Sequence, residues 1–169
     1  MTSVLNKLID VSHEDIILRT FIIFVQSAHT VLKYADAQFY RQTGLSAIKF
    51  IVLNGLAFHG GSMRPSEIAE WTYRERHNIT TLVDRLKQDG LVKTIRSNTD
   101  KRFISVVLTE KGREALSKAM PVAKEIVNQV MSSISKDDAV LLDKRLRVLR
   151  QNAHRGLRDI ARRSQPKPE

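Results

Sequence analysis

The side chains best suited to bind a ligand lie between Arg74 and Gln88, in a segment whose apolar residues repeat with helical spacing. At about 100° per residue, these apolar residues share one face of a helix: Ile79, Leu82, Val83 and Leu86. The opposite face carries long hydrogen-bond donors and cations. A helix fits the DNA major groove, where arginine and asparagine match base edges with paired hydrogen bonds. We therefore predict that this face reads DNA, through Arg74, Arg76, His77, Asn78, Thr80, Thr81 and Arg85.

A solvated helix face that binds nothing is the alternative for any one of these residues. Asp84 also points outward, where it would repel phosphate. Lys87 follows three residues later, so it is placed to neutralise Asp84.

The elements around this helix predict a helix-turn-helix. A short helix is expected over 65–71, with Pro65 in its first turn. The longer helix is expected over 73–88, where Thr72 and Glu75 form a capping-box pattern and Gly90 ends the helix.

Two alternating apolar runs, 91–96 and 102–108, then predict a β-hairpin around the polar turn 97–101. A helix-turn-helix followed by a hairpin is typical of a winged-helix DNA-binding module. Arg96, Lys101 and Arg102 lie at or near the tip, where arginine suits the negative potential of a minor groove. We expect Asp100 to structure the turn rather than to touch DNA.

Long helices are predicted on both sides of this module, giving a mostly α fold with a small β component (α+β). The expected helices are 14–41, ended by Gly44, then 46–58, capped by Ser46, then 110–134, containing Pro121 as a kink, and 136–163, capped by Ser135. Residues 62–64 could form a short strand, and residues 1–12 an arm. The first and last helices carry apolar seams that repeat near 3.5 residues, the spacing of helices packed along their length.

The seams predict a homodimer in which the terminal helices of two copies interlock, while packing inside one monomeric bundle is the alternative. On this basis the chain divides into a dimerisation part (1–44), a DNA-binding lobe (45–109) and C-terminal dimerisation helices with a basic tail (110–169).

Composition favours a polyanionic partner. The 169 residues carry a formal net charge of +10, and the pI is about 10.1. Nucleic acid is the first candidate and an anionic membrane surface the second. No uninterrupted apolar run reaches about 18 residues, and the N-terminus lacks a signal-peptide core, so a cytoplasmic protein without a membrane span is expected.

Few chemistries other than binding remain. The absence of cysteine excludes disulfides, thiolate metal sites and thiol redox sensing. The five histidines are scattered, so no metal or other cofactor is expected, and no catalytic motif suggests an enzyme. A pocket for a small-molecule effector could be lined by aromatic residues and a histidine, although aromatic residues at helical spacing are more often core: Phe21, Phe24, His29, Tyr34, Phe50 and Phe58.

Several motifs resemble those of one known family. Asp100-Lys101-Arg102, Leu108-Thr109 and Lys111-Gly112 are similar to the D-x-R…L-T-x-x-G signature of the multiple antibiotic resistance regulator (MarR) family. The stretch 82–86, followed by Gly90-Leu91-Val92, resembles that family's recognition helix leading into the wing. The order of helices matches over nearly the whole chain, whereas the run 71–77 is bulkier and more charged than is usual there.

The resemblance implies a homodimeric transcriptional regulator, usually a repressor, on pseudo-palindromic operators. It also implies that Arg102 contacts DNA from the wing, and that a small aromatic or phenolic ligand can release the protein from DNA. The competing hypothesis is an architectural or RNA-binding protein that uses the same basic surface without sequence preference.

Overall fold

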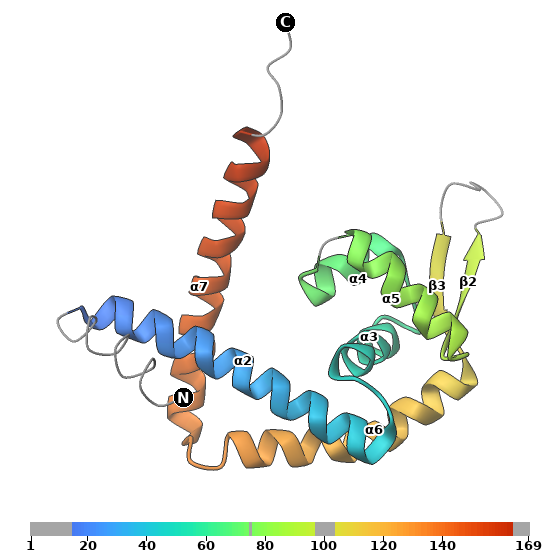
Figure 1. The fold of residues 1–169 in the computed structure, drawn as a ribbon, viewed down its shortest axis with the longest axis horizontal. Helices are drawn as coiled ribbons and strands as arrows, with labels where there is room; N and C mark the ends of the chain where they lie inside the picture. Colours follow the sequence, from blue (N-terminus) through green and yellow to red (C-terminus); the bar gives the residue numbers. More distant parts are fainter. Residues whose placement is uncertain (1–14, 75, 97–103, 164–169) are drawn as a thin grey trace, which may run out of the picture. The chain divides into compact units, whose positions relative to one another are not determined.

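The computed structural model describes residues 15–74, 76–96 and 104–163. It divides into two compact units, 1–129 and 130–169, and each is treated by itself. The first contains the helices and strands α2 (Ile16–Thr43), α3 (Ala47–Phe58), β1 (Ser62–Met63), α4 (Pro65–Thr72), α5 (Arg76–Gln88), β2 (Val92–Arg96), β3 (Ile104–Leu108) and α6 (Glu110–Val130), drawn in Figure 1. The second is built on α7 (Lys136–Arg163). The N-terminal arm predicted from the sequence lies outside the described residues.

Local signals in the sequence explain where the helices begin and end. Asp15 caps α2 by accepting hydrogen bonds from the backbone N–H groups of Ile17 and Leu18 at 2.8 and 3.0 Å. Gly44 ends α2 in the left-handed conformation, with φ of 73°. Ser46 caps α3, and Ser135 precedes α7 and accepts a hydrogen bond from the N–H of Asp138 at 3.1 Å. All of these boundaries lie within two residues of the prediction.

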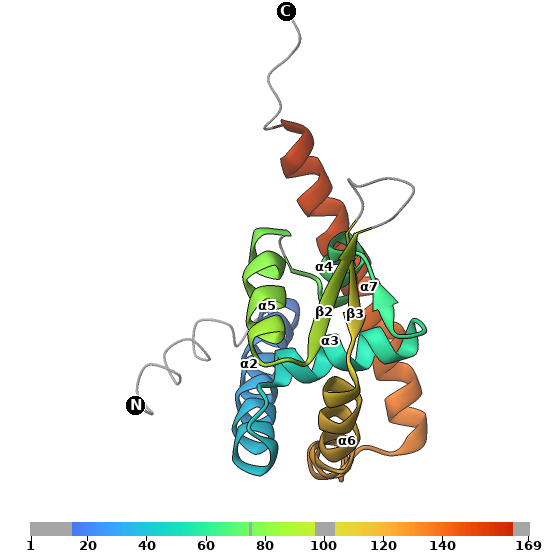
Figure 2. The same ribbon diagram turned by 90° about the vertical axis from the view of Figure 1, so that its right-hand side faces the viewer.

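The sheet has three antiparallel strands in the order β1-β3-β2. Strands β2 and β3 form the predicted hairpin, with Val92 opposite Leu108 and Arg96 opposite Ile104. Figure 2 shows these two strands side by side, with α5 next to them. The two-residue strand β1 pairs with the far edge of β3 through Ser62 and Met63, so the wing is attached to the residues that lead into α4.

The core of the first unit lies between the helix-turn-helix and the sheet. Its most deeply buried residues come from α3, α4, α5 and β3: Val52, Leu53, Leu56, Ile68, Ile79, Leu86 and Val106. This mostly helical architecture with a small antiparallel sheet is the predicted winged helix-turn-helix fold.

Helix α2 exposes much of its apolar surface within the single chain. It also meets the bare requirements for a membrane span, since it has 28 residues and a window of 18 with mean hydropathy 1.3, none of it buried. The expectation that no segment could span a membrane therefore needs correction, although Arg19 and Lys33 interrupt the apolar run. Length and composition alone are weak evidence for a span, because the core helix of a soluble protein and a signal sequence pass the same test.

Two predicted boundaries were wrong. Helix α5 begins at Arg76 rather than at residue 73, and Thr72 is the last residue of α4. The Thr72 hydroxyl donates to the carbonyl of Ile68 at 2.7 Å, so it is used inside α4 and does not cap the next helix. Helix α6 ends at Val130, four residues earlier than predicted, and a turn from Met131 to Ile134 follows.

Candidate nucleic-acid interface

Helix α5 separates a buried face from a polar face. Ile79 and Leu86 are completely buried, and Leu82 and Val83 nearly so. The polar side chains that remain outside are all exposed: His77, Asn78, Thr80, Thr81, Arg85 and Gln88. The predicted division of the helix is confirmed, and contact of the exposed face with DNA stays a prediction. Arg76 is the first residue of α5, and its side chain lies outside the described part of the molecule.

The turn before α5 places Arg74 outside the helix. Tyr73 adopts a left-handed conformation, with φ of 53° and ψ of 39°. The N–H of Arg74 donates to the carbonyl of Ala69 at 3.0 Å, which closes the end of α4. Arg74 is exposed in this turn, so it lies beside the N-terminus of α5 rather than on its outer face.

The C-terminus of α5 is held by a Schellman motif. The N–H of Leu91 donates to Leu86 at 2.9 Å and that of Gly90 donates to Lys87 at 2.9 Å, with Gly90 at φ of 73°. The side chains of Leu86 and Leu91 are both buried. The helix therefore enters the wing through a fixed turn.

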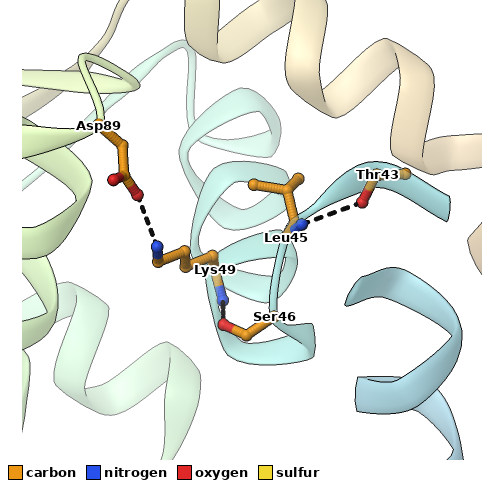
Figure 3. Close-up of polar contacts among 5 residues, drawn as sticks. All are labelled: Thr43, Leu45, Ser46, Lys49 and Asp89. Carbon is orange, nitrogen blue, oxygen red and sulfur yellow. Dashed lines mark hydrogen bonds and ion pairs between the residues drawn. The ribbon is translucent and has the colours of Figure 1, made fainter. Parts of the chain in front are cut away.

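An ion pair connects this turn to α3. The ammonium of Lys49 lies 2.5 Å from the carboxylate of Asp89, the residue that follows α5 (Figure 3). The backbone N–H of Lys49 donates to Ser46, and the N–H of Leu45 donates to the Thr43 hydroxyl at 3.2 Å, so the start of α3 is itself held in place.

The described part of the wing carries two exposed cations, Lys93 and Arg96, both on β2. Arg96 is exposed at the end of β2. Asp100, Lys101 and Arg102 lie outside the described residues, so their predicted roles remain predictions. Asp84 forms the expected pair with Lys87, at 3.7 Å, which reduces its repulsion of phosphate.

The comparisons with known proteins agree on one family. Residues 43–102 match the sequence model of the MarR family. The repressor YetL of Bacillus subtilis is 30% identical over 140 residues, which cover 82% of this chain and 80% of that protein. The chain belongs to the MarR family.

Two solved structures of transcriptional regulators show the same fold. The organohalide-sensing regulator RdhR-CbdbA1625, in its 2,4-dichlorophenol-bound form, aligns with a TM-score of 0.71 and 26% identity, covering 79% of this chain and 78% of that one. Sco3205 of Streptomyces coelicolor, a MarR family regulator in complex with DNA, aligns with a TM-score of 0.76 and 23% identity over 83% and 88% of the two chains. At the coarse level this protein is a DNA-binding transcriptional regulator, and its family is one of regulators rather than enzymes.

The second half of the MarR signature has a structural role here. The Thr109 hydroxyl donates to the carbonyls of Gly90 and Leu91, at 2.7 and 2.9 Å, and accepts from the N–H of Gly112 at 3.0 Å. A Cβ atom on Gly112 would overlap the Leu91 carbonyl oxygen and would lie 2.8 Å from Leu108 Cδ1. Thr109 and Gly112 thus attach the start of α6 to the turn that ends α5.

The six residues suggested for an effector pocket occupy several different environments in the single MarR chain. Phe21, Phe24 and His29 are exposed on α2. Phe50 stacks on Phe39 at 4.5 Å, beside the core.

The remaining two candidates also differ in their surroundings. The hydroxyl of Tyr34 accepts a hydrogen bond from the side chain of Gln38 at 3.0 Å. Phe58 is exposed and stacks on Trp71 at 5.7 Å. A shared pocket for the six residues therefore stays a prediction.

No group of three metal-ligating side chains occurs among the described residues. Hydrogen bonds from the backbone and side chain of Arg64 hold the pKa of Glu67 below its usual value. This carboxylate caps α4, so its role is structural.

Sequence reasoning missed the Lys49–Asp89 pair and the cluster of Phe58, His59 and Trp71, whose rings are in mutual contact. One signal for the pair was available, because each charge stands at the helix end that disfavours it. For the cluster the signal was Gly55 within a helix. A Cβ there would lie 2.6 Å from the Trp71 indole nitrogen.

Proposed function

We propose that the protein is a cytoplasmic repressor that binds a pseudo-palindromic operator as a homodimer. The observation that carries the proposal is the division of α5, whose apolar face is buried in the core while its donors and cations are left outside. A helix presented in this way fits the major groove. The net charge of +10 supplies the long-range attraction to the phosphate backbone.

Uncovered apolar surface supports the dimer. In α7, Leu142, Leu149 and Leu157 follow one another at about seven-residue spacing, and each is 41–60% exposed. In α2, Phe21 is 60% exposed. A second copy could cover both helices, and a two-fold pair would present two α5 helices to one duplex.

We further propose that a small aromatic ligand releases the repressor from DNA. The structural relative RdhR-CbdbA1625 has been solved with 2,4-dichlorophenol bound, and aromatic side chains of α2 are uncovered in the single chain. Adding 2,4-dichlorophenol and related phenols to the DNA complex tests this step. Loss of the shifted band at a ligand concentration that leaves the protein folded is the expected result for at least one member of the series.

Selection from a random-sequence pool tests the main proposal. We expect the purified protein to enrich a pseudo-palindrome with half-sites about one helical turn apart. In a gel-shift assay, unlabelled scrambled duplex should compete far less well than the selected duplex. Equal competition by both would contradict the proposal and favour an architectural protein that binds any duplex.

A further inference from the structure

The ion pair between Lys49 and Asp89 joins two charges that are each badly placed for their own helix. Lys49 is the third residue of α3, and Asp89 directly follows the last residue of α5. The partial charge at a helix N-terminus repels cations, and the partial charge at a C-terminus repels anions. Neither side chain therefore serves the stability of its own helix. The two residues are 40 positions apart in the sequence, and their contact places an opposite charge beside each of them.

The base of this bridge is fixed by other contacts. The N–H of Ala47, at the start of α3, donates to the carboxylate of Asp36 in α2 at 2.7 Å. Two residues later Lys49 reaches toward α5, with its side chain only 22% exposed. Figure 3 shows the extended lysine crossing from α3 to the end of α5. Its ammonium is therefore held at the Asp89 carboxylate, whose side chain is 42% exposed.

We infer that Lys49 and Asp89 are positioning residues that set the tilt of α5 for reading DNA bases. The 13 residues of α5 make a helix about 20 Å long. A tilt of about 5° at its C-terminal end would move its N-terminal end by nearly 2 Å. Good hydrogen bonds tolerate a variation of only about 0.5 Å in the donor–acceptor distance, so this shift would break them. The residues expected to meet bases, His77 and Asn78, lie at that N-terminal end. This inference rests on the proposed sequence-specific binding. It adds that the Lys49–Asp89 ion pair maintains the orientation of α5.

The substitution Asp89→Asn separates positioning from simple electrostatics, because the two predict opposite signs. Removal of a negative charge should strengthen binding to every duplex if charge alone matters. Positioning instead predicts weaker binding to the selected duplex, with unchanged or tighter binding to a scrambled duplex of equal length. We expect the ratio of the two affinities to fall about fivefold, as for the loss of a partly buried ion pair.

A matched control makes the same change of charge elsewhere. Glu114 is exposed on α6, so Glu114→Gln should leave the affinity ratio at its wild-type value. A reversed pair supplies the rescue. Lys49→Glu combined with Asp89→Lys keeps the net charge and puts each charge at the helix end that favours it. We expect this double variant to restore the affinity ratio to within about twofold of wild type.

Fluorescence anisotropy with the selected and scrambled duplexes gives both affinities, and circular dichroism confirms that each variant is folded. A folded double variant with a low ratio would overturn the inference, and so would a wild-type ratio in Asp89→Asn. If Asp89→Asn fails to fold, the double variant alone decides. A wild-type protein that selects no sequence would instead contradict the proposed function, so the two failures are distinguishable.

Discussion

Replacing Gly112 by alanine should destabilise the junction between the wing and α6. The new Cβ would overlap the carbonyl oxygen of Leu91 and would press on Leu108 Cδ1 at 2.8 Å. The Leu91 carbonyl accepts two hydrogen bonds from Thr109, from its N–H at 3.1 Å and its hydroxyl at 2.9 Å. Backbone atoms cannot rotate away as a flexible side chain can, so the start of α6 must move and both bonds must lengthen.

The magnitude follows from these contacts. Loss of two hydrogen bonds costs about 2 kcal/mol, and repacking Leu108 adds about 1 kcal/mol. Alanine in a helix returns about 1 kcal/mol relative to glycine. We therefore expect Gly112→Ala to lower the free energy of unfolding by about 2 kcal/mol.

Equilibrium unfolding in urea, followed by circular dichroism, measures this change. Ser117→Ala serves as the control, because Ser117 is exposed on the same helix and its replacement should change the free energy of unfolding by less than about 0.5 kcal/mol. A Gly112→Ala protein as stable as wild type would refute the steric reasoning. It would show that α6 can withdraw from Leu91 without cost.

Three further results are expected. Leu86→Ala should lower the free energy of unfolding by about 2–5 kcal/mol, because this completely buried side chain anchors α5 to the core; a loss below about 1 kcal/mol in urea unfolding would contradict that role. Glu67→Gln should flatten the acid dependence of the thermal midpoint. The pKa of Glu67 is lowered in the folded state, so its contribution is present above its ordinary value of 4.5 and is lost as the pH falls toward the lowered pKa; equal acid profiles for both proteins would exclude this. Leu157→Asp should weaken the proposed dimer in sedimentation experiments, and an unaltered sedimentation profile would remove α7 from the interface.

Local patterns in the sequence predicted most of the fold because each acts within a few residues. The apolar spacing in α5 predicted its buried face, and Gly44 and Ser46 predicted where α2 ends and α3 begins. The capping box at Thr72 failed because the same hydroxyl can bond backward to Ile68 within α4. Which of the two bonds Thr72 forms depends on the left-handed turn at Tyr73. Sequence did not predict that turn, because a bulky aromatic residue rarely adopts a left-handed conformation.

Contacts between distant parts of the chain were much harder to predict. Lys49 and Asp89 each stand at an unfavourable helix end, but only the fold, which brings α3 to the end of α5, shows that they pair with each other. The closeness of Gly112 to Leu91 depends on the path of the chain through the whole wing. For the candidate site, sequence therefore predicted which side chains face outward, while the contacts proposed to hold them at a fixed angle became visible only in the structure.

If the proposed dimer covers the exposed apolar side chains of α2, the behaviour of this protein will depend on its own concentration. Phe21, Ile23 and Leu32 are each more than half exposed, and any association that covers them gains free energy. Mass action then links folding and assembly, so dilution should lower the thermal midpoint. In a cell, occupancy of a DNA site would rise more steeply than in proportion to protein level. A modest change in synthesis could then switch a promoter that a stable monomer would only adjust gradually.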